Sequence, residues 1–128
     1  MKTIPALFEG SVKRFPDNVL VWEKSKGKYQ GITFMQIRDK VHRLASGLIN
    51  LGVKKGDRIA LLSEGRGEWL VSELAMLYLG AINVPLSIKI NEPSELSFRI
   101  KHAECKWIIC SNSQLQKIRD IKKDISRV

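Results

Sequence analysis

The stretch GLINLGVKKGDRIALL, residues 47–62, decides the fold. Its glycines Gly52 and Gly56 bracket a pair of lysines and stand directly before an apolar run. A phosphate-binding loop needs the spacing G-x-x-x-x-G-K-[ST], after a strand and before a helix. Here the glycines are one residue too close, Asp57 follows the second, and a helical pattern precedes the first. The stretch therefore predicts a helix closed by Gly52, a solvent-facing turn and a buried strand at Ile59–Leu62.

The segment ahead of this stretch predicts a long amphipathic helix. Thr33 can cap its amino terminus, and Gly52 stands where a left-handed residue would end it. An apolar stripe recurs at steps of three and four residues, namely Phe34, Ile37, Val41, Leu44, Leu48 and Leu51. The polar face carries Arg38, Asp39, Lys40, His42 and Arg43. The stripe must pack on other elements.

The residues ahead of Thr33 predict a short helix and a hairpin. Thr3 can cap a helix that Phe15-Pro16-Asp17 ends. Val19–Trp22 and Tyr29–Ile32 are typical of antiparallel strands around a turn at Lys24–Lys28.

Beyond Arg58, predicted strands and helices alternate. The strand Ile59–Leu62 is followed by a predicted helix at Trp69–Leu79, closed by Gly80, and by a strand at Ala81–Val84. A helix at Glu95–His102, capped by Ser94, then leads to a strand at Trp107–Cys110. A last helix starts at Ser111 or Ser113 and carries Leu115, Ile118, Ile121 and Ile125. This order favours right-handed βαβ units. The predicted fold class is α/β, with layered βαβ units and a small amino-terminal antiparallel hairpin.

The composition is that of a globular domain with a strongly basic charge. The chain has 128 residues and a net charge of +9, and its length fits a single domain over residues 1–128. The charge admits an alternative interpretation, a standalone basic α/β module that binds anionic lipid or nucleic acid. The lysines are scattered, however, so a merely solvated surface is favoured and no nucleic-acid partner is expected.

Cysteine usage and hydropathy favour an intracellular protein. Cys105 and Cys110 are too few for a disulfide framework, and on one strand their spacing would point them to opposite faces. Reduced thiols are typical of intracellular proteins. The start of the chain lacks the apolar core of a signal peptide, and the most hydrophobic window, 69–90, is interrupted by charged residues, glycine and proline. We expect a cytoplasmic location, with peripheral attachment to a membrane left open.

Side-chain chemistry alone points to no site. Gly65-Arg66-Gly67 follows a predicted strand and opens a predicted helix, yet Leu70 stands where a dinucleotide fingerprint has its third glycine. Glu64 and Glu68 would repel a phosphate there, which leaves a tight strand-to-helix connection. The remaining candidates are histidines expected at the surface, cysteines expected to be inert, and tryptophans without the basic–aromatic interleaving of a base-stacking platform: His42, His102, Cys105, Cys110, Trp22, Trp69 and Trp107. We therefore predict no catalytic, cofactor-binding or metal-binding residue.

An ordered set of motifs nevertheless resembles one enzyme family. Thr33-Phe34-Met35-Gln36-Ile37 is similar to T-[FYW]-x-[EQ]-[LI], and Ala45–Ala60 is similar to A-x-G-L-x-x-L-G-[VI]-x-x-G-D-[RK]-[VI]-A. Arg14–Asp17 resembles R-F-P-[DE], Glu68-Trp69 resembles a [PR]-E-W motif in which Gly67 replaces the first residue, and Gly80–Pro85 resembles G-A-[VI]-x-V-P. Together these motifs resemble the amino-terminal region of the AMP-forming acyl-CoA synthetases, in the adenylate-forming superfamily. The last two motifs resemble most the long-chain fatty-acid–CoA ligases.

The resemblance implies one part of a larger adenylation-domain fold. The full-length enzyme would use ATP, Mg²⁺ and coenzyme A to convert a fatty acid to an acyl-adenylate and then to acyl-CoA. The family's lysine-ending ATP loop, acidic adenylate motifs and carboxy-terminal catalytic lysine have no counterpart in residues 1–128. The resemblance therefore implies an inactive amino-terminal fragment that binds no cofactor.

The same resemblance names the expected partners. They are the remainder of the adenylation domain, the carboxy-terminal domain and, in the full-length enzyme, the fatty acid. Without those layers, the chain is expected to self-associate or to show an apolar surface near the helix Trp69–Leu79.

Overall fold

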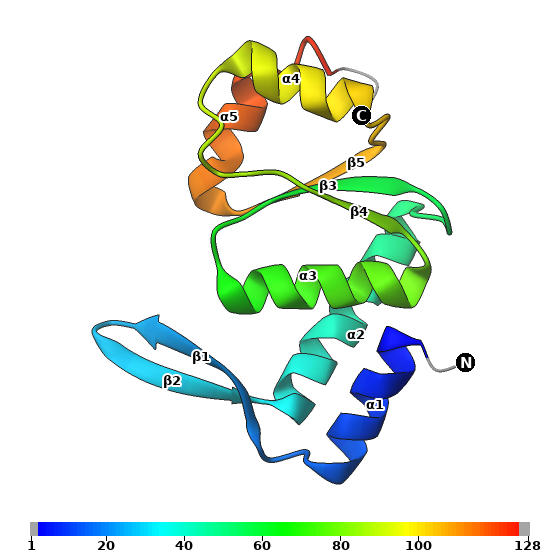
Figure 1. Ribbon diagram of the computed structural model, residues 1–128, viewed down its shortest axis with the longest axis vertical. Coiled ribbons are helices and arrows are strands. Elements are labelled where there is room, and N and C mark those ends of the chain that lie inside the picture. The colour runs from blue at the N-terminus through cyan, green and yellow to red at the C-terminus, as the bar shows by residue number, and fades with distance from the viewer. Residues whose placement is uncertain (1–2, 126–128) are drawn as a thin grey trace.

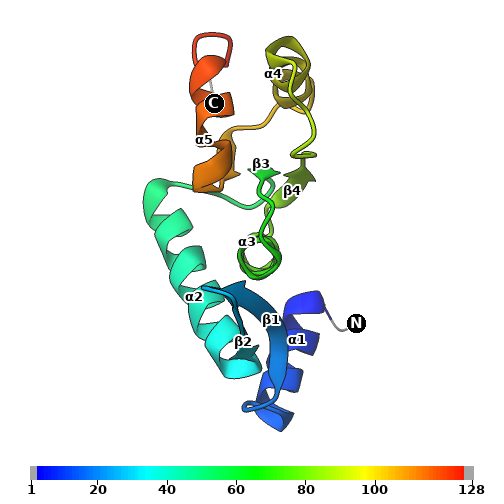
Figure 2. The ribbon, with the colours of Figure 1, turned by 90° about the vertical axis from the view of Figure 1, so that its left-hand side faces the viewer.

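A computed structural model describes residues 3–125 of the chain. The elements are, in order, α1 (Ile4–Arg14), β1 (Val19–Ser25), β2 (Lys28–Thr33), α2 (Phe34–Leu51), β3 (Arg58–Leu62), α3 (Arg66–Leu79), β4 (Ile82–Pro85), α4 (Pro93–His102), β5 (Trp107–Cys110), the 3₁₀ helix η1 (Asn112–Gln114) and α5 (Leu115–Asp120). Figure 1 shows α4 and α5 on one side of the parallel strands and α3 on the other, with α1 and the β1–β2 hairpin beyond α3. Figure 2 shows α2 running from the hairpin up to the sheet. The predicted α/β class with its amino-terminal hairpin is confirmed.

The hairpin turn is tighter than the sequence pattern predicted. β1 and β2 pair antiparallel out to Ser25 and Lys28. Only Lys26 and Gly27 remain to reverse the chain, and their φ angles are 52° and 78°. Two-residue hairpin turns of this kind require positive φ, which glycine adopts without strain. The turn predicted over Lys24–Lys28 is therefore too long.

α2 begins and ends where the sequence places it. The Thr33 hydroxyl accepts a hydrogen bond from the Gln36 amide at 3.2 Å, and the Gln36 side chain accepts one from the Thr33 amide at 2.9 Å. This reciprocal pair is a capping box. At the other end Gly52 has a φ of 107°, and the Val53 amide donates to the Leu48 carbonyl at 3.0 Å. Both predicted ends are confirmed.

Two of the three glycines of the opening stretch, Gly52 and Gly47, are expected to respond in opposite directions to alanine. Gly52→Ala puts a β-carbon on a left-handed residue and should lower the free energy of unfolding by about 1–2 kcal/mol. Gly47 lies inside α2, where nothing lies within 4 Å of an added β-carbon. Gly47→Ala should therefore raise the free energy of unfolding by about 0.5–1 kcal/mol. Urea unfolding measures the change in the free energy of unfolding for each variant. Changes of the same sign would contradict the assignment of Gly52 as the left-handed residue that ends α2.

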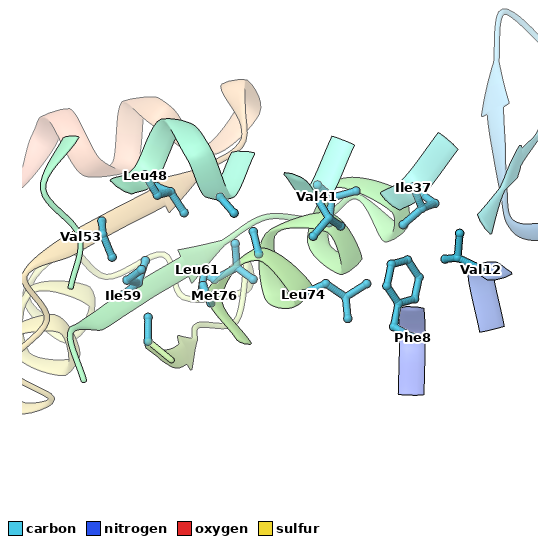
Figure 3. Packing of buried hydrophobic residues seen from close by; sticks show 14 of the residues in the cluster. Phe8, Val12, Ile37, Val41, Leu48, Val53, Ile59, Leu61, Leu74 and Met76 are labelled. Atoms are coloured by element: carbon cyan, nitrogen blue, oxygen red, sulfur yellow. The ribbon is translucent and has the colours of Figure 1, made fainter. Parts of the chain in front are cut away.

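β3 is the centre of a parallel sheet with the order β4-β3-β5. Residues 59–62 are 0% exposed, as the continuous apolar run predicted. Ile59 and Leu61 belong to a cluster with α1, α2 and α3, whereas Ala60 and Leu62 belong to one with α4 and the segment after α5. Figure 3 follows the first cluster from Phe8 and Val12 of α1 through α3 to β3. The sheet is thus covered on both faces.

α3 lies inside the protein rather than at an apolar surface. α1, α2 and β1 contact it as well as β3 and β4. Within residues 3–125, none of the large apolar side chains that stay exposed lies on α3. The amino-terminal elements thus cover most of α3, and the apolar surface predicted near Trp69–Leu79 is confined to Trp69 and Leu70, which line a groove with the exposed Trp22.

Several predicted boundaries are also wrong. α3 begins at Arg66, since Gly65 takes the extended conformation of an N-cap. α4 begins at Pro93 and not after a Ser94 cap, because proline at the first helical position has its φ preset. β4 lies one residue later than predicted.

The last predicted helix is short. Ser111 precedes the 3₁₀ turn η1, and α5 ends at Asp120. Ile121 and Ile125 nevertheless stay only 1% and 7% exposed, because the turns after α5 still pack them on the sheet. Their apolar pattern reflects burial rather than helix length. Within residues 3–125, no helix is both long enough and apolar enough to cross a membrane.

β5 is the strand predicted at Trp107–Cys110, and it is a half-buried edge strand. It has β3 as its neighbour on one side only. Cys105 precedes β5 and follows Glu104, whose φ is 55°, so strand alternation does not extend to it. Cys105 and Cys110 therefore contact the same cluster, and their predicted placement on opposite faces is wrong. Both thiols are free, and burial raises the pKa of each.

Candidate functional site at the carboxyl edge of the sheet

The topology creates one crevice of the kind that binds ligands in open α/β sheets. β3 leads into α3 on one face of the sheet, and the neighbouring β5 leads into η1 and α5 on the other face. Adjacent parallel strands whose connections diverge in this way leave a crevice outside their carboxyl ends. The residues at that position are Ser63 and Glu64 after β3, and Ser111 to Gln114 after β5.

Glu64 spans this crevice. Its carboxylate accepts hydrogen bonds from the Ser111 hydroxyl at 3.1 Å, from the Gln114 amide at 3.0 Å and from the Ser113 hydroxyl. The bonds from Ser113 and Ser111, the former the stronger, lower the pKa of Glu64, so its negative charge is held at the crevice. An anionic phosphate would meet this charge and find the hydroxyl donors already used.

The amino terminus of α3 is occupied in a similar way. Gly65 is its N-cap and makes no side-chain cap hydrogen bond. The carboxylate of Glu23 from β1 lies against Gly67, where an added β-carbon would collide with it, and Glu68 lies beside Gly65. Carboxylates complement the positive end of a helix dipole. Gly65-Arg66-Gly67 therefore serves as a strand-to-helix connection that β1 can approach closely.

An apolar groove of about 640 Å³ lies between the hairpin and this edge. Leu20, Trp22, Trp69 and Leu70 supply its apolar wall, and Glu64 also lines it. A second, more polar hollow of about 450 Å³ has Trp22, Glu23, Tyr29 and Glu68 in its lining. Trp22 is 60% exposed, so much of its ring is available to a partner. Within residues 3–125, no group of three or more His, Cys, Asp and Glu side chains could hold a metal ion. The exposed apolar wall suits the docking of a partner.

Gly52 and Gly56 of the opening stretch lie at the opposite, amino edge of the sheet. A phosphate cradle needs free backbone amides. The amides of Gly52, Val53, Lys54, Gly56 and Asp57 all donate within the protein instead. The prediction that this loop is a turn and not a phosphate-binding loop is thereby confirmed.

Asp57 fastens that turn to the sheet. It is 9% exposed and accepts from the Lys54 amide at 2.9 Å and from the Trp107 ring nitrogen at 3.1 Å. Lys106 forms an ion pair with it at 3.5 Å. The bonds from the Lys54 amide and the Trp107 ring chiefly hold the pKa of Asp57 below its ordinary value. Trp107 is thus a structural partner of the Gly-Asp turn.

A further polar cluster went unpredicted. Glu9 of α1 accepts hydrogen bonds from Arg38 and His42 of α2, each at 2.8 Å, and from the Tyr78 hydroxyl of α3. Burial alone would raise the pKa of Glu9, but the bonds from Tyr78, Arg38 and His42 lower it to about 2. Burial, together with the bond to Glu9, raises the pKa of Tyr78. Arg38 and His42 thus lie on a face that is only partly solvated, because α1 packs beside them and leaves their side chains 34% and 40% exposed.

His102 is exposed, as predicted, and its ring stacks on Phe98 at 5.3 Å. Glu9 and Glu64, which accept the hydrogen bonds of the two polar clusters, do not lie in a local sequence motif that would predict this role. For Glu64 a signal did exist, since it lies two residues after β3 and Ser111 directly follows the neighbouring parallel strand β5.

The fold and its loops define an α/β scaffold, and comparisons with known proteins identify the family to which it belongs. A family model described as AMP-binding enzyme matches residues 8–128. The chain belongs to this family of AMP-binding enzymes.

Particular relatives are acyl-CoA ligases. The chain is 32% identical over 123 residues to a long-chain-fatty-acid–CoA ligase of Rattus norvegicus, across 95% of this chain and 18% of that protein. It is 29% identical over 111 residues to a mitochondrial medium-chain acyl-CoA ligase of the same species, across 84% of this chain and 17% of that protein. The structure of the N-terminal domain of FACL13 from Mycobacterium tuberculosis matches with a TM-score of 0.86 and 27% identity, across 95% of this chain and 30% of that chain.

These findings confirm the resemblance to AMP-forming acyl-CoA synthetases. They give no support to a standalone lipid- or nucleic-acid-binding module. The chain spans less than a fifth of the length of the two curated relatives. The absence of catalytic, cofactor-binding and metal-binding residues stays a prediction.

Proposed function

We propose that the chain is the amino-terminal scaffold of an ATP-dependent long-chain fatty-acid–CoA ligase, a single subdomain over residues 1–128. The observation that carries this proposal is the match of residues 8–128 to the AMP-binding enzyme family. The full-length enzyme would activate a fatty acid with ATP and Mg²⁺ to an acyl-adenylate and then transfer the acyl group to coenzyme A. The chain alone would bind none of these groups and would be inactive.

The structure supports a positioning role for these residues. Glu64 links the loops after β3 and β5, and Asp57 links the amino ends of the same two strands through Trp107. Both ends of the sheet are thereby held in register. The groove of Trp22 and Trp69 offers an apolar wall to the remainder of the adenylation domain. That remainder and the carboxy-terminal domain are the proposed partners, and self-association is proposed when they are absent.

The preference for long chains rests on the Glu68-Trp69 and Gly80–Pro85 motifs. The relatives include long-chain and medium-chain ligases, so the preferred length of the fatty-acid substrate needs its own measurement. A cytoplasmic location is part of the same proposal.

Release of AMP that depends on fatty acid and coenzyme A tests the ligase. We expect none from the 128-residue chain. We expect activity, greater on hexadecanoate than on octanoate, from the protein encoded when the reading frame of the source gene is continued past codon 128. That continuation should encode a glycine-rich, Ser/Thr-rich loop ending in lysine. AMP release by the chain alone, or an in-frame stop at codon 129, would overturn the proposal.

A further inference from the structure

The β1–β2 hairpin is anchored to the rest of the chain at its base, next to a bend. At the base, the Phe34 amide donates a hydrogen bond to the Asn18 carbonyl at 3.0 Å. The pairing of β1 with β2 shifts register between Val19 and Val21, an irregularity of the kind that bends a strand. Figure 1 shows the tip of the hairpin reaching past the amino end of α3. The hairpin is thus a lever that is fixed at one end only.

A hollow lies between the hairpin and the two helices behind it. This hairpin hollow has a volume of about 320 Å³. Its lining includes Ile32 of β2, Ile37 of α2, and Val71 and Ser72 of α3, which are 8%, 0%, 8% and 6% exposed. These parts of its wall are therefore closed to solvent. An empty space provides no atoms for the hairpin to contact, so packing across it does not hold the hairpin down.

Close to the base, the hairpin does pack on the core. Leu20 and Val21 of β1 contact the cluster that α1, α2 and α3 share. Further along β1, Glu23 is the residue that both lines the hairpin hollow and lies against α3. Glu23 is therefore placed to fix the part of the hairpin that the core does not hold.

Glu23 meets α3 in the first turn of that helix. A β-carbon added at Gly67 would lie 2.9 Å from Glu23 Cδ and closer still to Oε1. The N-cap, Gly65, has no side chain with which to cap the helix, and a carboxylate at this end complements the helix dipole. The φ of Gly67 is not positive, so this position uses the missing β-carbon of glycine and not its backbone freedom. Glu23 approaches α3 because Gly67 leaves room for it.

We propose that the hairpin is a hinged flap over the hairpin hollow, latched by Glu23 onto the amino end of α3. Release of the latch opens the hollow by a rotation at the base, while β1 and β2 stay paired. Gly67 replaces the first residue of the [PR]-E-W motif, and a side chain there would push Glu23 away from α3. Glu68 still complements the helix from within its own first turn, so α3 stays folded when the flap opens. This inference goes beyond the proposed ligase function and does not depend on it.

A thiol in the wall of the hollow reports the opening. Ser72→Cys is a small change at a residue that is 6% exposed, so iodoacetamide should label it slowly in the closed state. Peptide mass spectrometry follows this thiol separately from Cys105, which is 6% exposed in the cluster on the other face of the sheet. Labelling of Cys105 reports unfolding of the whole chain. If Ser72→Cys does not fold, Val71→Cys replaces it as the reporter.

Release of the latch should raise the labelling rate at residue 72 and leave that of Cys105 unchanged. We expect Glu23→Gln to raise it about two- to fivefold, the range for a carboxylate at a helix amino terminus. Gly67→Ala should raise it at least as much, although alanine ordinarily stabilises a helix. The two substitutions together should raise it no further than Gly67→Ala alone, since both release the same latch.

Gly47→Ala is the matched control, because it makes the same change inside α2 where nothing lies within 4 Å of the added β-carbon. It should leave the labelling rate at residue 72 unchanged. Circular dichroism checks that each variant is folded.

Four results would overturn the proposal. They are equal rises at residue 72 and Cys105, no rise with Gly67→Ala, the same rise with Gly47→Ala, and a combined variant whose rise is the product of the two separate rises. The last result would mean that Glu23 and Gly67 act independently.

Discussion

Leu61→Ala is expected to lower the free energy of unfolding by about 3–4 kcal/mol, because the residue lies fully buried in the central strand. Leu61 is 0% exposed and belongs to the cluster that joins β3 to α2 and α3. Removing its side chain takes away apolar contacts and leaves a cavity that a close-packed core fills only in part. The measurement is urea unfolding followed by circular dichroism, with the midpoint compared at a constant slope.

Leu51→Ala is the matched control for this result. Leu51 is 68% exposed at the last residue of α2, so the same chemical change should cost less than about 0.5 kcal/mol. If Leu61→Ala cost as little as the control, β3 would not be the buried centre of the sheet.

Glu9→Gln is expected to lower the free energy of unfolding by about 1–2 kcal/mol at neutral pH, since the carboxylate joins three helices. The glutamine can accept fewer of the hydrogen bonds from Arg38, His42 and Tyr78, and it lacks the charge that pairs with Arg38. The Glu9 side chain is 35% exposed, so solvent screening keeps the loss well below that of a fully buried pair.

The free energy of unfolding that Glu9→Gln removes should become smaller as pH falls. The pKa of Glu9 is lowered from 4.5 to about 2, so folding favours the charged form. Its stabilisation is therefore complete above pH 4.5 and disappears as pH falls towards about 2. The wild type should lose stability through this window faster than Glu9→Gln does, and the two curves should converge at its acid end. Asp39→Asn, elsewhere on α2, is the control, and parallel curves for wild type and Glu9→Gln would contradict the predicted role.

Local signals in the sequence predicted the elements well. Thr33 and Gly52 each act through their own backbone geometry, and both ends of α2 lie where those residues put them. The run at Ile59–Leu62 was enough to predict a strand covered on both faces, because its lack of alternation has a direct physical cause. The motif Gly56-Asp57 was correctly read as a turn, although its bond to Trp107 could not be read from the sequence.

Contacts between distant segments were the part that sequence reasoning missed. Tyr78 and Glu9 are 69 residues apart, and Ser111 and Glu64 are 47 apart. Such pairs depend on how helices pack and not on local propensity. A helical pattern shows that Arg38 and His42 lie opposite the apolar stripe, but it does not show that α1 covers that side. The extent of the apolar surface near α3 was overestimated for the same reason.

The strand order also decides when this chain can finish folding. β3 is made first, yet the partners on its two edges, β4 and β5, both follow it in the sequence, and β5 comes last. During synthesis an apolar strand must therefore wait with one edge unpaired until β5 leaves the ribosome. Non-local parallel pairing of this kind is slow, and unpaired strand edges aggregate. A nascent chain halted before Trp107 therefore exposes one unpaired edge of β3, and the arrival of β5 closes that edge.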